Sequence, residues 1–475
     1  MRIGWVAVLA WATCASPVLA DRVDDYVRAQ LAARHLPGVS IAIVKDGRLI
    51  KAEGYGVASL ELDAPATART VYEIGSISKQ FAADAILLLV EDGKLRLDDP
   101  VSQYIDHTPA AWSAMTLRHV LTHTAGLPDF DTGNIGFSYR RDYTADEFIE
   151  LVTKQPLQFA PGERWQYTNG FPILGLIVER VSGMSYMEFV ETRIFKKLGL
   201  ASARFKKNGE VVPQRADGYL FTDNTYHHGE PLRPAIIAPN GGILINAIDF
   251  AAWDIAITQG RLLRPESLKA MTTPARLNNG RTVSHGLGWF MDRFNGHPFG
   301  AHWGTTVGGH SAVIRRYVDD RLTVIVLANM DEGGGFAVDA MSKTIADMYV
   351  PGVAFPGLQP VTDVKAAAIE HWTAVLTAVA HGVEHPDAPG LATRLPAPVR
   401  ERLATAIGVS TSHSSSTASA TLAYLGDERV TDGHFNLDPA LATLRRYRAS
   451  TPSATRYLTL RLSAAGQLLG VVVED

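Results

Sequence analysis

The order of the expected elements is the feature that most limits the folds open to this 475-residue chain. Two apolar segments near the N-terminus, 39–44 and 48–52, flank Asp46-Gly47, a dipeptide typical of a tight hairpin turn. A long and mostly helical middle follows, and a β-branched apolar strand comes only at 322–329. Strands at both ends of one domain predict an α+β fold, with an antiparallel sheet built from both ends and flanked by helices.

A change in composition near residue 350 divides the chain. The stretch 351–363 contains three prolines and two glycines, which is typical of a linker. Beyond it, 364–475 combines a helical segment, a Ser/Thr-rich segment and a hairpin, and we expect a small α+β domain whose role the sequence does not indicate. The main domain is therefore expected over 21–350.

The first 20 residues have the pattern of a secretory signal. Arg2 precedes an apolar run over 3–12, and Val18-Leu19-Ala20 is typical of a cleavage site. The apolar run is too short to span a membrane, and no later stretch predicts a transmembrane helix. We expect cleavage after Ala20 and a periplasmic or secreted mature protein.

Composition argues against several classes of function. The 45 basic and 49 acidic residues nearly balance and form no basic stripe, so we expect no nucleic-acid partner. The single cysteine, Cys14, lies in the predicted signal, which leaves the mature chain without a disulfide, a thiol nucleophile or a thiolate metal site. No phosphate-binding loop or dinucleotide fingerprint is found either, and we expect no metal and no organic cofactor.

A serine followed three residues later by a lysine precedes a predicted helix over 80–92. The spacing places Ser76 and Lys79 one turn apart on one helical face. Backbone N–H groups at a helix start favour developing negative charge, and a lysine helps to remove the proton from a serine hydroxyl. The pair is typical of an acylation site, but an ordinary polar helix start has the same pattern.

Tyr167 and Asn169 form a second candidate segment. A tyrosine accepts the serine proton and returns it to a leaving group if a nearby ammonium lowers its pKa well below the ordinary value of about 10. Asn169 offers an amide that would orient both a substrate amide and the lysine. The alternative is a turn whose tyrosine packs into the core.

The third candidate segment is His302-Trp303-Gly304, which precedes Thr305. A glycine in a strand lets a substrate approach the backbone closely. The backbone N–H of Thr305 would then pair with that of Ser76 as an oxyanion hole. The alternative is an ordinary strand histidine.

The three segments, in this order and rough spacing, resemble the serine β-lactamase-like family of class C β-lactamases, DD-carboxypeptidases, D-aminopeptidases and related esterases. The resemblance spans roughly 25–350 and extends to surrounding segments at 36–39, 93–100, 121–127, 241–242 and 286–289. It implies a β-lactamase/transpeptidase-like sheet flanked by helices, a separate all-helical region, and a site between them.

The resemblance also implies roles for the candidate residues. Ser76 would be the nucleophile, Lys79 its activating partner, Tyr167 the general base and acid, and Asn169 an orienting group. His302 occupies the position where β-lactamases and carboxypeptidases usually carry a lysine. Because a histidine is largely neutral at pH 7, we expect a weaker hold on substrate carboxylates and a lean towards esters or amides that lack one.

The expected reaction is acyl transfer through a serine ester, on a small-molecule or peptide substrate with an ester, amide or lactam carbonyl. A β-lactamase, a D-amino-acid peptidase or a DD-carboxypeptidase is the alternative among enzymes. A penicillin- or peptidoglycan-binding sensor that acylates with slow turnover is the alternative outside them. The sequence does not indicate an oligomeric state.

Two histidine patterns are interpreted as structural. Residues 381–385 match the H-x-x-E-H pattern of zinc peptidases, but Gly382 and the following Pro386 favour a loop over the helix which that chemistry needs. His119 and His123 have the spacing of a metal-binding pair. No third ligand is evident, so we expect packing there.

Overall fold

The computed structural model describes residues 17–129, 136–207, 209–229, 235–331, 335–354, 366–409, 421–429, 441–450 and 455–474. Most of the predicted signal lies outside these residues. Helix α1 (Pro17–Arg34) runs without a break through the expected cleavage point, and cleavage after Ala20 stays a prediction. None of the described helices has the length and apolar character needed to span a bilayer.

A seven-stranded sheet in the order β3-β2-β1-β12-β11-β10-β9 forms the centre of the main domain. Its strands are β1 (Gly38–Lys45), β2 (Arg48–Ser59), β3 (Ala64–Pro65), β9 (Phe290–Phe294), β10 (His297–Thr306), β11 (His310–Tyr317) and β12 (Leu322–Ala328). β1 pairs antiparallel with β12, which brings the two ends of the domain together. The predicted antiparallel sheet is therefore confirmed.

The turn between β1 and β2 explains how the hairpin closes. Asp46 and Gly47 have φ angles of 52° and 72°, and positive φ at both central residues is what a type I′ turn requires. Asparagine, aspartate and glycine take up this conformation at low cost.

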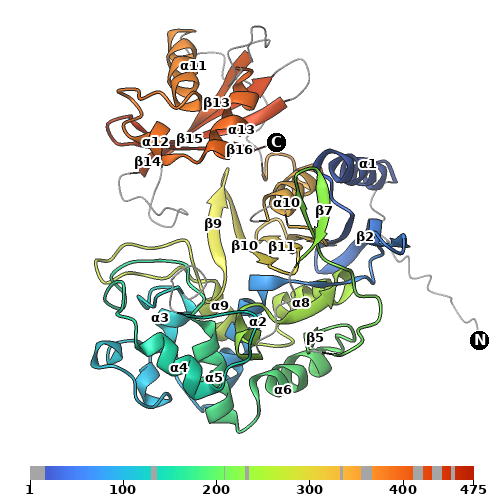
Figure 1. Ribbon diagram of the computed structural model, residues 1–475, viewed down its shortest axis with the longest axis vertical. Helices are drawn as coiled ribbons and strands as arrows, with labels where there is room; N and C mark the ends of the chain where they lie inside the picture. Colours follow the sequence, from blue (N-terminus) through green and yellow to red (C-terminus); the bar gives the residue numbers. More distant parts are fainter. Residues whose placement is uncertain are drawn as a thin grey trace, which may run out of the picture.

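Helices cover both faces of the sheet (Figure 1). On one face α1 and α10 (Phe336–Tyr349) pack against alternate residues of β1 and β12, such as Ile41 and Val326. On the other face α2 (Ser78–Glu91) and α8 (Ala247–Thr258) pack against their neighbours. Because both faces are buried, the central strands appear in the sequence as continuous apolar runs rather than alternating ones.

The helical region lies beside α2 in the lower half of Figure 1 and contains α3 (Leu117–Leu121), α4 (Ala145–Thr153), α5 (Phe171–Ser182) and α6 (Tyr186–Val190). A three-stranded sheet of β4 (Val71–Glu73), β8 (Ile243–Asn246) and β5 (Arg204–Phe205) leads into α2. The remaining strands and α-helices of the main domain are β6 (Tyr219–Thr222), β7 (Thr225–His228), α7 (Ala238–Gly241) and α9 (Pro265–Thr272). It also contains the short 3-10 helices η1 (Gly75–Ile77), η2 (Val101–Gln103), η3 (Ala110–Trp112) and η5 (Ala235–Ile237), and the π-helix η4 (Glu191–Lys196).

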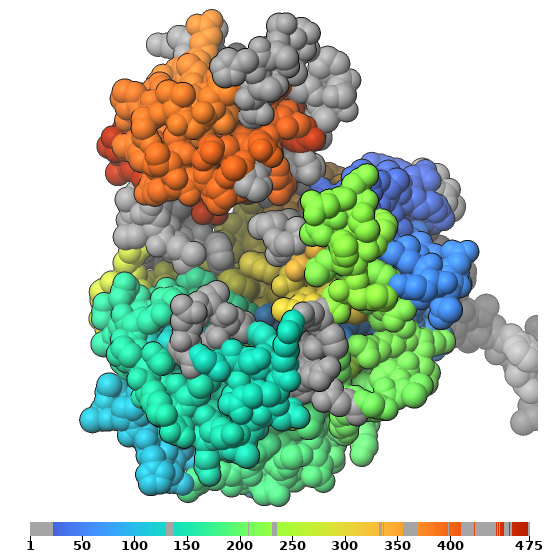
Figure 2. Space-filling model, viewed as in Figure 1, coloured from blue at the N-terminus to red at the C-terminus, as the bar shows by residue number. Residues whose placement is uncertain are grey.

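The C-terminal region has a hydrophobic cluster of its own and forms the orange and red lobe of Figure 2. A four-stranded antiparallel sheet of β13 (Thr421–Arg429), β14 (Leu441–Ser450), β15 (Thr455–Ser463) and β16 (Leu468–Glu474) packs with α11 (Ala366–Ala380), α12 (Leu391–Arg394) and α13 (Ala397–Ile407). The predicted hairpin is β15–β16. The predicted linker overlaps 355–365, which lie outside the described residues, so the domain boundary stays a prediction.

Candidate active site

Ser76 lies in the short 3-10 turn η1, between β4 and the first residue of α2. The sequence predicts a helix start at this point, and the structure places the serine just ahead of the α-helix. Every other residue of 71–89 is buried, whereas Ser76 is half-buried. The candidate nucleophile is thus the one residue of this segment that a substrate can reach.

Lys79 joins the serine to the second candidate segment. Its Nζ donates a hydrogen bond to Ser76 Oγ at 3.1 Å and another to Asn169 Oδ1 at 3.0 Å. The same ammonium lies 5.0 Å from the centroid of the Tyr167 ring. A fully buried ammonium needs such partners, because burial of an unpaired charge is costly. The structure therefore brings together four residues that lie up to 93 positions apart in the sequence.

The side-chain amide of Asn169 is held by groups that the sequence does not single out. Its Nδ2 donates to Asp129 Oδ1 at 3.2 Å, which leaves Oδ1 facing the lysine. Its backbone carbonyl accepts a hydrogen bond from Asn240 Nδ2 of α7 at 2.7 Å. Asp129 and Asn240 are isolated polar residues in the sequence without a motif, so pattern alone could not find them.

Two glycines bring β10 against the serine turn. A Cβ atom on Gly304 would lie 2.1 Å from the carbonyl oxygen of Ile74 and 2.7 Å from the backbone nitrogen of Ser76. Gly75 has a φ of +50°, and a Cβ there would lie 2.5 Å from the carbonyl oxygen of Thr305. Both contacts allow only glycine. They set the backbone of Thr305 beside that of Ser76, where an oxyanion hole is predicted.

His302 is buried on β10 beside the ring of Tyr167, with the two ring centroids 6.1 Å apart. Its Nδ1 lies 2.6 Å from the carbonyl oxygen of Trp303, so Nδ1 carries the proton and donates it. Burial lowers the pKa of His302 well below its ordinary value. The imidazole is therefore neutral near pH 7, as the sequence leads us to expect.

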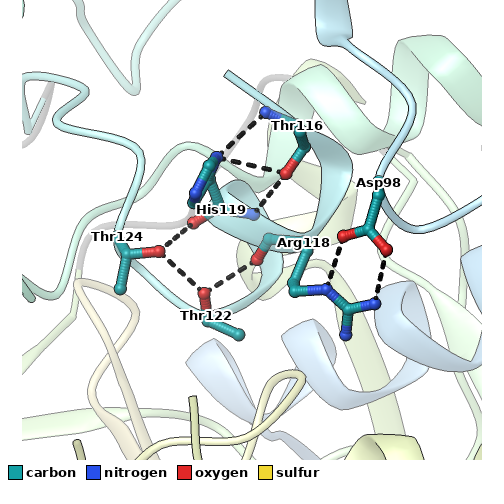
Figure 3. Close-up of polar contacts among 6 residues, drawn as sticks. All are labelled: Asp98, Thr116, Arg118, His119, Thr122 and Thr124. Carbon is teal, nitrogen blue, oxygen red and sulfur yellow. Dashed lines mark hydrogen bonds and ion pairs between the residues drawn. The ribbon is translucent and has the colours of Figure 1, made fainter. Parts of the chain in front are cut away.

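Two further histidines lie against this group, and the sequence predicts a catalytic role for neither. The rings of His123 and His285 meet edge-on with centroids 4.7 Å apart. His285 Nδ1 donates to the carbonyl oxygen of Gly286 at 2.7 Å, and burial lowers the pKa of His285 to about 3. His119 instead turns to Thr116 at the start of α3 (Figure 3). Within the described ranges, no group of three or more candidate ligands is arranged to hold a metal ion.

Comparison with known proteins gives a consistent result. The family model described as Beta-lactamase matches residues 23–347. A penicillin-binding protein of Bacillus subtilis (strain 168) is 29% identical over 329 residues, which cover 64% of this chain and 70% of that protein. Protein flp of Staphylococcus aureus (strain MRSA252) is 26% identical over 66% of this chain, and the match spans 63% of its own length.

Two solved structures resemble the fold. The octameric penicillin-binding protein homologue from Pyrococcus abyssi has a TM-score of 0.60 and 21% identity, and the likeness covers 96% of this chain and 98% of that one. The D-amino acid amidase from Ochrobactrum anthropi SV3 has a TM-score of 0.59 and 24% identity, over 70% of this chain and 97% of that one. The first of these likenesses includes the C-terminal region as well as the main domain.

Proposed function

The chain belongs to the Beta-lactamase family, and we propose that it is a serine hydrolase that forms an acyl-enzyme on Ser76. One observation carries the proposal. Ser76 is half-buried and accepts a hydrogen bond from the fully buried Lys79. The ammonium of Lys79 also donates to Asn169 and lies against the ring of Tyr167. This grouping supports the proposal because acyl transfer needs a nucleophile, a positive charge and a proton acceptor close together.

The proposed reaction has two halves. Ser76 Oγ attacks the carbonyl carbon and its proton passes to the phenolate of Tyr167, which then returns that proton to the leaving alcohol or amine. The negative charge on the carbonyl oxygen is stabilised by the backbone N–H groups of Ser76 and Thr305. Water then attacks the acyl-serine, Tyr167 takes the water proton, and the acid is released with the proton restored to the serine.

The ammonium of Lys79 supports the first half in two ways. It lies close to Tyr167, and a nearby positive charge lowers the pKa of a phenol, so that the phenolate is more populated. It also faces Ser76 Oγ, where negative charge gathers as the proton leaves. Asn169, oriented by Asp129, holds this ammonium in place.

We propose esters or amides without a free carboxylate as the substrate class. His302 would sit where a substrate carboxylate binds in lysine-bearing relatives, and its buried ring is neutral. The fold is shared with a D-amino acid amidase, which by analogy favours amide chemistry alongside ester chemistry. An extracytoplasmic location, from the predicted signal, is part of the same proposal.

A penicillin- or peptidoglycan-binding sensor is the second candidate, and the similarity to a penicillin-binding protein favours it. The two candidates share the acylation step and differ in deacylation. Several equivalents of product per enzyme molecule, formed with substrate in excess, support the hydrolase. A burst of one equivalent, followed by no further product, supports the sensor.

The test is hydrolysis of a short-chain p-nitrophenyl ester by the wild-type chain and by Ser76→Ala. The proposal expects activity in the wild type and its loss, by a factor of about 10³ or more, in the variant. Equal rates in the two proteins would show that the ester is cleaved without Ser76, and this outcome would overturn the proposal.

A further inference from the structure

The turn that follows α3 is fixed by two threonine hydroxyls (Figure 3). Thr122 Oγ1 donates to the carbonyl oxygen of Arg118 at 2.8 Å, and it lies 2.9 Å from Thr124 Oγ1. The carbonyl oxygen of His119 lies 3.5 Å from Thr124 Oγ1. All three residues of 122–124 are buried. The residue between the threonines, His123, is therefore held from both sides.

His123 adopts a conformation that residues other than glycine rarely take, with a φ of 57°. From this position it contacts the backbone on both sides of Tyr167. The carbonyl oxygen of His123 accepts a hydrogen bond from the N–H of Gln166 at 2.9 Å, and its Nδ1 accepts one from the N–H of Thr168 at 3.2 Å. Its ring lies against the Tyr167 ring, with centroids 4.5 Å apart and an angle of 31° between the planes.

The charge state of His123 follows from these contacts. Nδ1 accepts a hydrogen bond, so the proton of the neutral ring lies on Nε2. Burial lowers the pKa of His123 well below its ordinary value, which agrees with a neutral ring. Three titratable side chains lie against Tyr167 in the described structure, namely Lys79 of α2, His302 of β10 and His123 itself. Of these three, the two histidines are neutral, so the charge that acts on the phenol from this group is that of the lysine.

We propose that His123 is a positioning residue that fixes the phenol of Tyr167 relative to the ammonium of Lys79. The inference rests on the proposed function, in which Tyr167 is the base. Three contacts from one buried side chain and its carbonyl hold the residues before and after the tyrosine, and the tyrosine ring itself. A protonated His123 would have no acceptor for Thr168, so the contact depends on the neutral ring.

The experiment compares the pH dependence of kcat/KM for ester hydrolysis in the wild type and in His123→Phe. Phenylalanine keeps an aromatic ring against Tyr167 but has no acceptor for Thr168. Because His123 is neutral, the substitution removes no charge. A shift of the ascending limb therefore reports a movement of the phenol away from the ammonium. We expect kcat/KM to fall by about 10-fold or more and this limb to move up by about half a pH unit or more.

His285→Phe is the matched control. It makes the same change in a neutral, buried histidine of the same cluster, but the ring of His285 hydrogen-bonds to Gly286, outside the tyrosine segment. If His123 acted only through packing, both variants would behave alike. We expect the ascending limb of the pH profile to shift in His123→Phe and to keep its wild-type position in His285→Phe.

Thr122→Val provides a second test should His123→Phe fail to fold. It removes the hydroxyl that joins Thr124 to α3 with little change in volume, and it should move the limb in the same direction by a smaller amount. If the ascending limb of the kcat/KM profile lies at the wild-type pH in every folded variant, the inference is overturned. That outcome is distinct from failure of the proposed function, in which the wild type would show no hydrolysis that depends on Ser76.

Discussion

At the scale of single residues, one buried ammonium organises the site. Lys79 makes hydrogen bonds to Ser76 and Asn169 and lies against the ring of Tyr167. The orientation of Asn169 is in turn set by Asp129. Removal of any of these partners takes one hydrogen bond from a buried ammonium or amide, and such a loss costs more than the loss of an exposed hydrogen bond.

The first prediction concerns His302. His302→Lys places an ammonium where the neutral imidazole now lies. The ratio of kcat/KM for a carboxylate-bearing ester to kcat/KM for a matched neutral ester should therefore rise by about 10-fold. His302→Gln is the control, because it is neutral and should leave the ratio of the two rates unchanged. A ratio that stays at the wild-type value in His302→Lys would show that this position does not select against carboxylates.

Ser76 and Lys79 could be paired from their spacing, and the resemblance to a known family grouped them with Asn169. The structure joins these three side chains in one hydrogen-bonded chain, while their roles stay a prediction. Asp129 and the contacts of His123 could not be predicted. Their hydrogen bonds join segments about 40 residues apart through single atoms, and no periodic pattern records such a contact.

At the scale of elements, helix α2 carries a buried acid in addition to the buried Lys79. Asp84 lies two turns beyond Ser76, is fully buried, and accepts a hydrogen bond from Trp253 Nε1 of α8 at 3.0 Å. Burial raises the pKa of Asp84 to about 8 from an ordinary 3.8. The carboxyl group is therefore largely protonated at neutral pH in the folded protein and ionised in the unfolded chain.

The second prediction follows from this difference. The folded state binds the additional proton between pH 3.8 and about 8, so the contribution of Asp84 to stability falls as pH rises through this window. Asp84→Asn keeps an acceptor for Trp253 and removes the titration. Its free energy of unfolding, measured in urea between pH 6.5 and 8, should fall less steeply than that of the wild type.

Unfolding is measured above pH 6.5 because the buried histidines change the free energy of unfolding below that pH. Their lowered pKa values make stability fall as pH drops through 6.5. Asp146→Asn, an exposed substitution on α4, is the control and should leave the slope unchanged. An unchanged slope in Asp84→Asn would contradict a buried, protonated carboxyl group.

The sequence predicts elements best where burial is continuous. The helix expected over 80–92 and the strand expected at 322–329 are confirmed, because their apolar patterns are long. The apolar pattern does not set the bounds of any strand over 290–306, where β9 and β10 lie. The glycines and the proline of that segment weaken its strand pattern, yet Gly304 is what lets β10 approach Ser76.

At the scale of the whole molecule, the hydrophobic clusters separate the chain into two parts. The two clusters of the main domain contain no residue beyond Ala354, and a third contains only residues from 369 onwards. Within the described ranges, none of these clusters joins the two parts. Each part therefore buries its apolar side chains against itself.

The third prediction is that a chain ending at Ala354 folds and keeps its activity. Its ester hydrolysis should stay within a few-fold of the full-length rate, because no described residue of the proposed mechanism lies beyond this point. Circular dichroism and thermal unfolding check the fold, and kcat/KM checks the site. A folded but inactive fragment would show that the C-terminal region contributes to the site.

The central claim is an acyl-enzyme on Ser76, and mass spectrometry tests it most directly. The wild-type chain is mixed with p-nitrophenyl acetate, quenched in acid during turnover, and digested for peptide mapping. The account predicts one acetyl group on the peptide that contains Ser76, and no acetyl group on that peptide in Ser76→Ala. Acetylation at another residue in the wild type, or equal labelling of the variant, would contradict it.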